Sequence, residues 1–234
     1  MTEGALMAGA GIGLVAGMAV GRNAPRIWLA ATLLSAGAAL AAAVEALLAT
    51  GAAWEWQPGY IICGQAIYLR LDALRALFLA LLSLVGGAGA AYAHEYWSDA
   101  AHPRSARAGR VWWNGLLLGL GLVLITLNGL HFLIAWELFT VCAYFLVTLD
   151  RSRPEVRAAG WLYLGASHVA ALCLFAFFGT LAARMGSWEL GDMRSHTEFA
   201  PLFWLALAGF GLKAGLFPLH VWLPSAHANA PSHV

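Results

Sequence analysis

The sequence predicts an all-α, multi-pass transmembrane helix bundle with about seven spans, the last of them broken at Pro218. The composition is the first reason, because 61% of the 234 residues are hydrophobic and only 11% are charged. Soluble domains carry about 25% charged residues. The mean hydropathy of +0.72 agrees. The apolar runs are also each close in length to the roughly 20 residues that a helix needs to cross a bilayer.

The charge and the cysteines exclude several classes of function. A net charge of +1 without a basic stripe argues against a nucleic acid as partner. Cys63, Cys142 and Cys173 lie far apart, with no CxxC pair. Cys142 and Cys173 fall in apolar runs and are interpreted as small buried hydrophobic residues. We therefore expect this chain to bind no metal, iron–sulfur cluster or other cofactor by itself.

The first apolar run, Gly4 to Val20, follows Met1-Thr2-Glu3 and lacks the positive start of a secretory signal, so it is interpreted as a spanning helix. Glycines recur in it at every fourth residue, which puts them on one helix face where a neighbouring helix can approach closely. They are Gly9, Gly13, Gly17 and Gly21.

Six further spans follow along the chain. The segment from Thr50 to Arg70 holds Trp54, Trp56 and Tyr60 and is interpreted as a loop at the depth of the lipid headgroups. The expected spans are Ile27–Ala49, Leu71–Ala93, Val111–Leu127, Leu130–Leu149, Gly160–Ala183 and a seventh from Phe199. We divide them into a three-span region over residues 1–110 and a second domain over residues 111–234.

The arginines distribute unequally between the two sets of loops that such a topology creates. One set, after the first, third and fifth spans, holds eight, and the opposite set holds three: Arg70, Arg184 and Arg194. The eight are Arg22, Arg26, Arg104, Arg107, Arg110, Arg151, Arg153 and Arg157. By the positive-inside rule, the N-terminus is expected outside the cell and the arginine-rich loops in the cytoplasm.

Two ionisable residues inside apolar runs predict a functional site, since each costs about 2.5–3.5 kcal/mol to insert. Lys213 is the one lysine of the chain, beside twelve arginines. Arginine stays protonated, whereas a desolvated lysine can release its proton. Glu137 lies in the fifth span and begins a polar stripe that continues with Thr140, Tyr144 and Thr148. A purely structural ion pair is the alternative interpretation of Glu137 and Lys213.

The two charges could control each other if the fold brings them together. At about 6 Å and an effective dielectric constant of about 20, they would interact by about 2.8 kcal/mol. His168 in the sixth span is a further candidate for proton transfer, with a hydrogen-bonded packing residue as the equal alternative.

The seventh run is interrupted after Lys213. Pro218 removes a backbone donor, and Pro224 is expected to delay any new helix. Unwound backbone at membrane depth lines protein or water-filled cavities, and broken helices mark ion sites in transporters. His220 and His227 follow the break and could pass protons.

Two motifs, WELFTVCAYFLV and GLKAGLFPLHVWLPSAHANAPSHV, resemble the antiporter-like membrane subunits of respiratory complex I, Mrp-type antiporters and membrane-bound hydrogenases. With the stretch YLRLDALRALFLALLSLVGGAGAAYAHEYW, the resemblance covers the chain from Tyr68 onward and is strongest to the branch of hydrogenase-4 component B and formate hydrogenlyase subunit 3. Ser225, where complex I members usually have aspartate, also favours hydrogenase-type or Mrp-like relatives.

The resemblance implies proton translocation in a redox-driven complex of the bacterial plasma (inner) membrane. Glu137 and Lys213 map onto the family's proton-handling pair, and His168, His220 and His227 onto its histidines. Iron–sulfur clusters, nickel or flavin are expected in partner subunits. Because the family has about fourteen or more helices, the chain is expected to be an N-terminal fragment. A Na⁺(K⁺)/H⁺ antiporter subunit and a non-transporting structural fragment are the two alternatives.

Overall fold

The computed structural model describes residues 2–49, 51, 53–191 and 197–234. Within them, six helices are long and apolar enough to span a membrane, which confirms the all-α multi-pass prediction. They are α1 (Thr2–Gly21), α2 (Pro25–Leu48), α3 (Ala73–Tyr96), α4 (Ala106–Ile125), α5 (Gly129–Val147) and α6 (Pro154–Met185).

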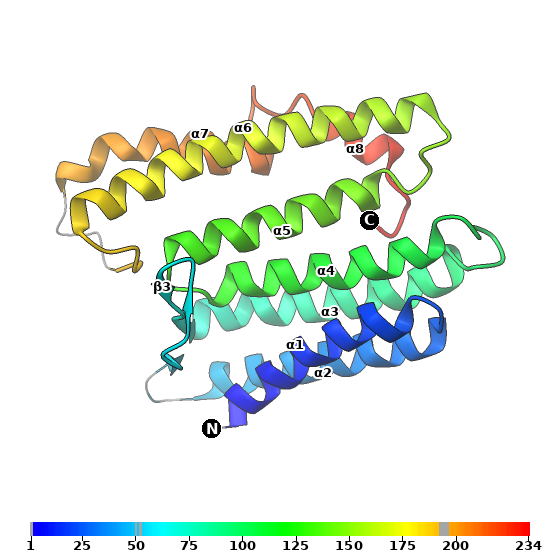
Figure 1. Ribbon diagram of the computed structural model, residues 1–234, viewed down its shortest axis with the longest axis horizontal. Coiled ribbons are helices and arrows are strands. Elements are labelled where there is room, and N and C mark those ends of the chain that lie inside the picture. The colour runs from blue at the N-terminus through cyan, green and yellow to red at the C-terminus, as the bar shows by residue number, and fades with distance from the viewer. Residues whose placement is uncertain (1, 50, 52, 192–196) are drawn as a thin grey trace.

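The long helices run side by side, so that successive loops alternate between the two ends of the bundle (Figure 1). The loops after α1, α3 and α5 lie together at one end, and these are the loops rich in arginine. Four short strands and the C-terminal end of α6 lie at the other end. Arg194, one of the three arginines assigned to that second end, lies outside the described residues.

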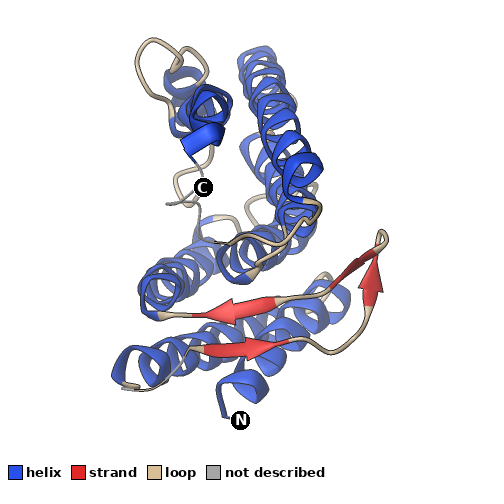
Figure 2. Ribbon diagram, turned by 90° about the vertical axis from the view of Figure 1, so that its left-hand side faces the viewer, coloured by secondary structure: helices blue, strands red, loops and turns tan. Residues whose placement is uncertain are grey.

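The segment predicted as an interfacial loop forms two small antiparallel ribbons across one end of the bundle (Figure 2). Its strands are β1 (Trp54–Trp56), β2 (Ile61–Ile62), β3 (Gln65–Ala66) and β4 (Leu69–Leu71), with β1 paired to β4 and β2 to β3. The Leu127 N–H donates to the Tyr68 carbonyl at 2.9 Å, which ties this segment to the turn before α5.

The glycine face of α1 packs closely against its neighbours, as predicted for three of the four glycines. A Cβ atom at Gly13 would collide with Ser35, one at Gly17 with Asn114 and one at Gly21 with Trp28. A Cβ at Gly9 would meet no atom within 4 Å among the described residues. Gly13, Gly17 and Gly21 therefore allow α2 and α4 to approach α1.

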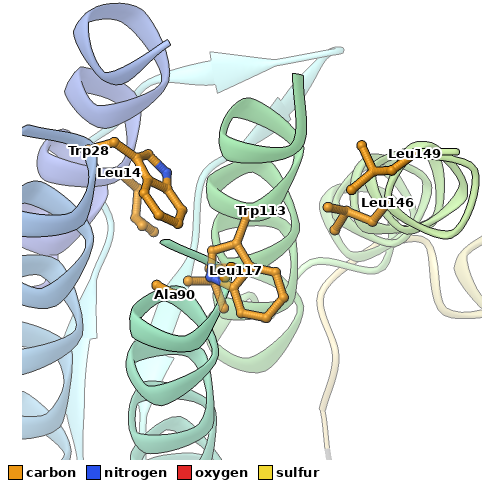
Figure 3. Packing of buried hydrophobic residues seen from close by; sticks show 8 residues of the cluster. Leu14, Trp28, Ala90, Trp113, Leu117, Leu146 and Leu149 are labelled. Carbon is orange, nitrogen blue, oxygen red and sulfur yellow. The ribbon is translucent and has the colours of Figure 1, made fainter. Parts of the chain in front are cut away.

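A buried polar network holds α1, α2 and α4 together. The Trp28 indole N–H donates to Asn114 Oδ1 at 3.0 Å, and the Thr32 hydroxyl donates to the same oxygen at 2.9 Å. The Asn114 amide in turn donates to the Leu14 carbonyl at 3.1 Å. Around it lies a hydrophobic cluster to which α1 to α5 contribute, with Leu14, Trp28, Ala90, Trp113, Leu117 and Leu146 among its members (Figure 3).

The seventh span differs in detail from the prediction. A 3-10 helix (Thr197–Leu202) precedes α7 (Phe203–Ala214), which ends at Gly215 in the left-handed conformation, with φ of 72°. The break therefore begins three residues before Pro218, because Gly215 adopts a backbone conformation that other residues avoid. Twelve residues rise only about 18 Å, so α7 does not cross the bilayer alone.

The helix then resumes sooner than predicted, as α8 (Leu223–Asn229). Pro224 lies in the first turn of α8, where a backbone N–H would have no acceptor within the helix, so its absence costs nothing. This proline therefore favours the start of a helix and does not delay one. The Trp222 indole N–H donates to the Leu212 carbonyl at 2.8 Å and fixes α8 against the end of α7.

Asp72 caps the N-terminus of α3, and its replacement gives a first prediction. Its carboxylate accepts from the Arg75 backbone N–H at 3.0 Å and pairs with the Arg75 guanidinium. We expect Asp72→Ala to lower the free energy of unfolding by about 1 kcal/mol, the usual value of a lost cap. Equilibrium unfolding in mixed detergent micelles measures this change.

The same cap makes stability depend on pH. Burial acts to raise the pKa of Asp72, but the hydrogen bonds and charge of Arg75 outweigh it, so that the pKa lies below its usual range. A depressed carboxylate pKa stabilises the fold above about pH 3.9, and this contribution is lost as the pH falls through the depressed value. Asp72→Asn keeps a capping oxygen, and it should remove this acid sensitivity at a smaller cost than Asp72→Ala. An equal cost for the two variants would contradict the assignment of a cap.

Candidate functional site

The Lys213 side chain lies between three helices in the second half of the chain. Lys213 is in the last turn of α7, and its ammonium group donates to the hydroxyl oxygens of three buried side chains. The distances from Nζ are 3.0 Å to Thr140 on α5, 2.9 Å to Tyr163 on α6 and 3.1 Å to Ser167 on α6. Tyr163 and Ser167 share one face of α6 because they are four residues apart.

This hydroxyl cage, formed by Thr140, Tyr163 and Ser167, suits a group that gains and loses a proton. An ammonium has three donors and no acceptor, and the three oxygens can accept all of them. A neutral amine has a lone pair, and a hydroxyl that rotates can donate to it. The Phe139 and Tyr163 rings, with centroids 4.7 and 4.6 Å from Nζ, add cation–π attraction to the charged form.

Glu137 does not contact the amine directly. Its carboxylate Oε2 lies 3.7 Å from Nε2 of His168 on α6, and no ion pair within 4.0 Å joins it to Lys213 in the part of the chain that the structure describes. Glu137 and Thr140 are three residues apart on α5, so the carboxylate lies about one helical turn from the cage. The side chains of Glu137 and His168 are 30% and 52% exposed.

The hydrogen bond of His168 to its own helix determines which ring nitrogen faces Glu137. His168 Nδ1 lies 2.9 Å from the Leu164 carbonyl, which can only accept, so Nδ1 carries the proton of that hydrogen bond. A neutral imidazole would then turn an unprotonated Nε2 toward the Glu137 carboxylate. The pair is attractive when Nε2 or the carboxyl group is also protonated.

The remaining predicted residues lie on the far side of the break in the seventh span. The His220 ring packs on Phe217 at 5.5 Å between centroids, and its buried Nδ1 has no hydrogen-bond partner among the described residues. His227 is exposed in the last turn of α8. Neither histidine has a described contact with Lys213, so the structure does not join them into one chain of hydrogen bonds.

Two members of the hydroxyl cage were not predicted from the sequence. Tyr163 and Ser167 lie in an apolar helix next to the more conspicuous His168. Their four-residue spacing was the available signal, but many hydroxyl pairs in membrane helices only bond their own backbone. Among the described residues, no three His, Cys, Asp or Glu side chains are grouped so that they could hold a metal ion.

Comparison with known proteins agrees with this architecture. Residues 127–234 match the family model described as NADH:quinone oxidoreductase/Mrp antiporter, TM. Hydrogenase-4 component B of Escherichia coli K12 is 30% identical over 70% of this chain and 25% of its own length. NADH-quinone oxidoreductase subunit N of Desulforudis audaxviator is 30% identical over 89% of this chain and 42% of its own length.

A solved structure of the Mrp complex from Dietzia sp. DQ12-45-1b aligns with 97% of this chain and 44% of the matched chain, at a TM-score of 0.80 and 25% identity. The chain thus spans less than half the length of these relatives. The resemblance inferred from the two sequence motifs is confirmed. Over residues 127–234, just under half of the chain, the sequence matches the NADH:quinone oxidoreductase/Mrp antiporter transmembrane family.

Proposed function

We propose that this chain is part of a proton-translocating membrane subunit of a redox-driven complex of the NADH:quinone oxidoreductase or hydrogenase type. The observation that carries the proposal is the Lys213 amine, which lies between membrane helices in a cage of three neutral hydroxyls. Relatives named as hydrogenase and NADH-quinone oxidoreductase components support the redox-driven type.

In this proposal, Lys213 holds the transported proton, and the Glu137–His168 pair sets the electrostatic field around it. When the pair carries a net negative charge it stabilises the ammonium, and when it takes up a proton that stabilisation disappears. His220 and His227 are proposed to continue the route beyond the break at Gly215. The described hydrogen bonds leave gaps along this route, which ordered water would have to bridge.

We further propose the bacterial plasma membrane as the location, with the N-terminus outside. The eight-to-three distribution of arginines between the two sets of loops predicted from the sequence supports this orientation. The partners are then other membrane and peripheral subunits. Iron–sulfur clusters, nickel or flavin in those partners would perform the electron chemistry.

The test is proton uptake by inverted membrane vesicles that contain the full-length subunit in its complex. Lys213→Met should lower proton uptake on the order of 100-fold while complex assembly persists, because no amine remains in the cage to take up and release the proton. Glu137→Gln should reduce proton uptake less, since the amine is retained. Arg107→Met, which removes an exposed positive charge elsewhere, is the control. Normal proton uptake by an assembled Lys213→Met complex would leave only a structural role.

A Na⁺(K⁺)/H⁺ antiporter subunit is the second candidate, favoured by the similarity to the Mrp complex. The same vesicles distinguish the two functions. Redox-driven translocation requires an electron donor, whereas an antiporter moves protons in response to a sodium or potassium gradient alone.

A further inference from the structure

An open groove of 790 Å³ lies at the arginine-rich end of the bundle, away from Lys213. It runs between the beginning of α4 and the end of α5, where the α3–α4 and α5–α6 loops meet the helices (Figure 1). The lining residues that matter here are His102, Arg104, Trp112, Phe145, Asp150 and Arg151.

The rim of this groove at the arginine-rich end of the bundle is cationic. In the described part of the chain, neither Arg104 nor Arg151 lies within 4.0 Å of a carboxylate. Arg151 is held in place, because its guanidinium donates to the Thr148 hydroxyl at 3.2 and 3.3 Å and lies 5.0 Å from the Phe145 ring centroid. Asp150 also lines the groove, so the rim has two positive charges against one negative charge.

The wall below the rim is aromatic. The Trp112 and Phe145 rings stack with centroids 4.2 Å apart and an interplanar angle of 12°. Trp112 lies six residues into α4, about 9 Å deeper than the start of that helix. With α4 as a membrane-spanning helix, the guanidinium groups would lie near the lipid headgroups and the aromatic rings where the acyl chains begin.

We propose that this groove binds an anionic glycerophospholipid, with the phosphate between Arg104 and Arg151 and an acyl chain along Trp112 and Phe145. Arginine pairs with phosphate through its planar fork of donors, and basic pockets between membrane helices are suited to lipid headgroups. A free phosphate would leave the aromatic wall exposed, and a hydrocarbon without a headgroup would leave both guanidinium groups without an anionic partner. A lipid matches the whole surface.

The experiment is a titration of the detergent-solubilised full-length protein with phosphatidylglycerol, with the thermal unfolding midpoint as readout. Phosphatidylcholine and glycerol 3-phosphate are titrated in parallel. We expect phosphatidylglycerol to raise the midpoint and the other two to leave it nearly unchanged. In the Arg104→Gln/Arg151→Gln variant, the concentration for half the effect should increase on the order of tenfold or more.

Arg107→Gln/Arg153→Gln is the matched control, because it removes the same charge from exposed positions outside the groove. An equal loss in both double variants would indicate general surface attraction and overturn the proposal. An equal response to glycerol 3-phosphate would overturn the lipid assignment. If Arg104→Gln/Arg151→Gln is already unfolded with phosphatidylcholine, the single variant Arg104→Gln provides the test. Its effect on the fold should be small, since no side-chain hydrogen bond of Arg104 is found within the described residues.

Discussion

Lys213→Arg should lower proton translocation on the order of 100-fold, although it keeps the positive charge. Arginine cannot release its proton in a protein, so it cannot alternate between two states as the amine does. The loss corresponds to the lower range of what a positioned proton-transfer group contributes. The measurement is the ratio of proton uptake to electron transfer in vesicles of the assembled complex.

The geometry of the cage adds a second reason for this loss. The Lys213 amine saturates three hydroxyls from Thr140, Tyr163 and Ser167. A guanidinium has five donors in a fixed plane and is larger, so it would leave donors without acceptors. Lys213→Arg should therefore behave like Lys213→Met in proton transfer. Transport at the normal rate in Lys213→Arg would show that a fixed charge suffices, and the proton-release mechanism would be wrong.

Gly209→Val should reduce translocation at least about tenfold while leaving Lys213 itself unchanged. A Cβ atom at Gly209 would lie 2.6 Å from Leu174 Cδ2 and 3.0 Å from the Ala170 carbonyl, both on α6. Because a backbone carbonyl cannot give way like a flexible side chain, α7 must move away from α6. Lys213 is one helical turn further along α7, so the amine would leave Tyr163 and Ser167. Overpacking of this kind costs about 1–3 kcal/mol.

Gly179→Val is the matched control for this substitution. Gly179 is a helical glycine of α6, and a Cβ there meets no described atom within 4 Å. Both variants change helix propensity in the same way, but only Gly209→Val disturbs the contact between α6 and α7. Proton uptake and the thermal unfolding midpoint are measured for both. Equal effects of the two variants would show that the close approach of α7 to α6 does not position the amine.

Much of the architecture could be predicted from the sequence, because membrane spans depend on local composition. Hydropathy located the six long helices, and the glycine spacing in α1 predicted a packing face that Gly13, Gly17 and Gly21 form. The ribbon of β1 and β4 could not be predicted, since it pairs segments that lie far apart along the chain, Trp54–Trp56 with Leu69–Leu71. The seventh span breaks at Gly215, which adopts the left-handed conformation. From the sequence, the break was predicted at the nearby Pro218 instead.

For the candidate site, the sequence by itself determined that one lysine and one glutamate lie within apolar helices, and that a helix breaks after the lysine. Only the tertiary structure decided their partners. It places Lys213 among the hydroxyls of Thr140, Tyr163 and Ser167, and it places Glu137 beside His168. The cost of a charge in a membrane is a property of each residue in its own helix, whereas the groups that stabilise it come from other helices. Those contacts are set by how α5, α6 and α7 pack, and the order of residues along any one of them does not contain that information.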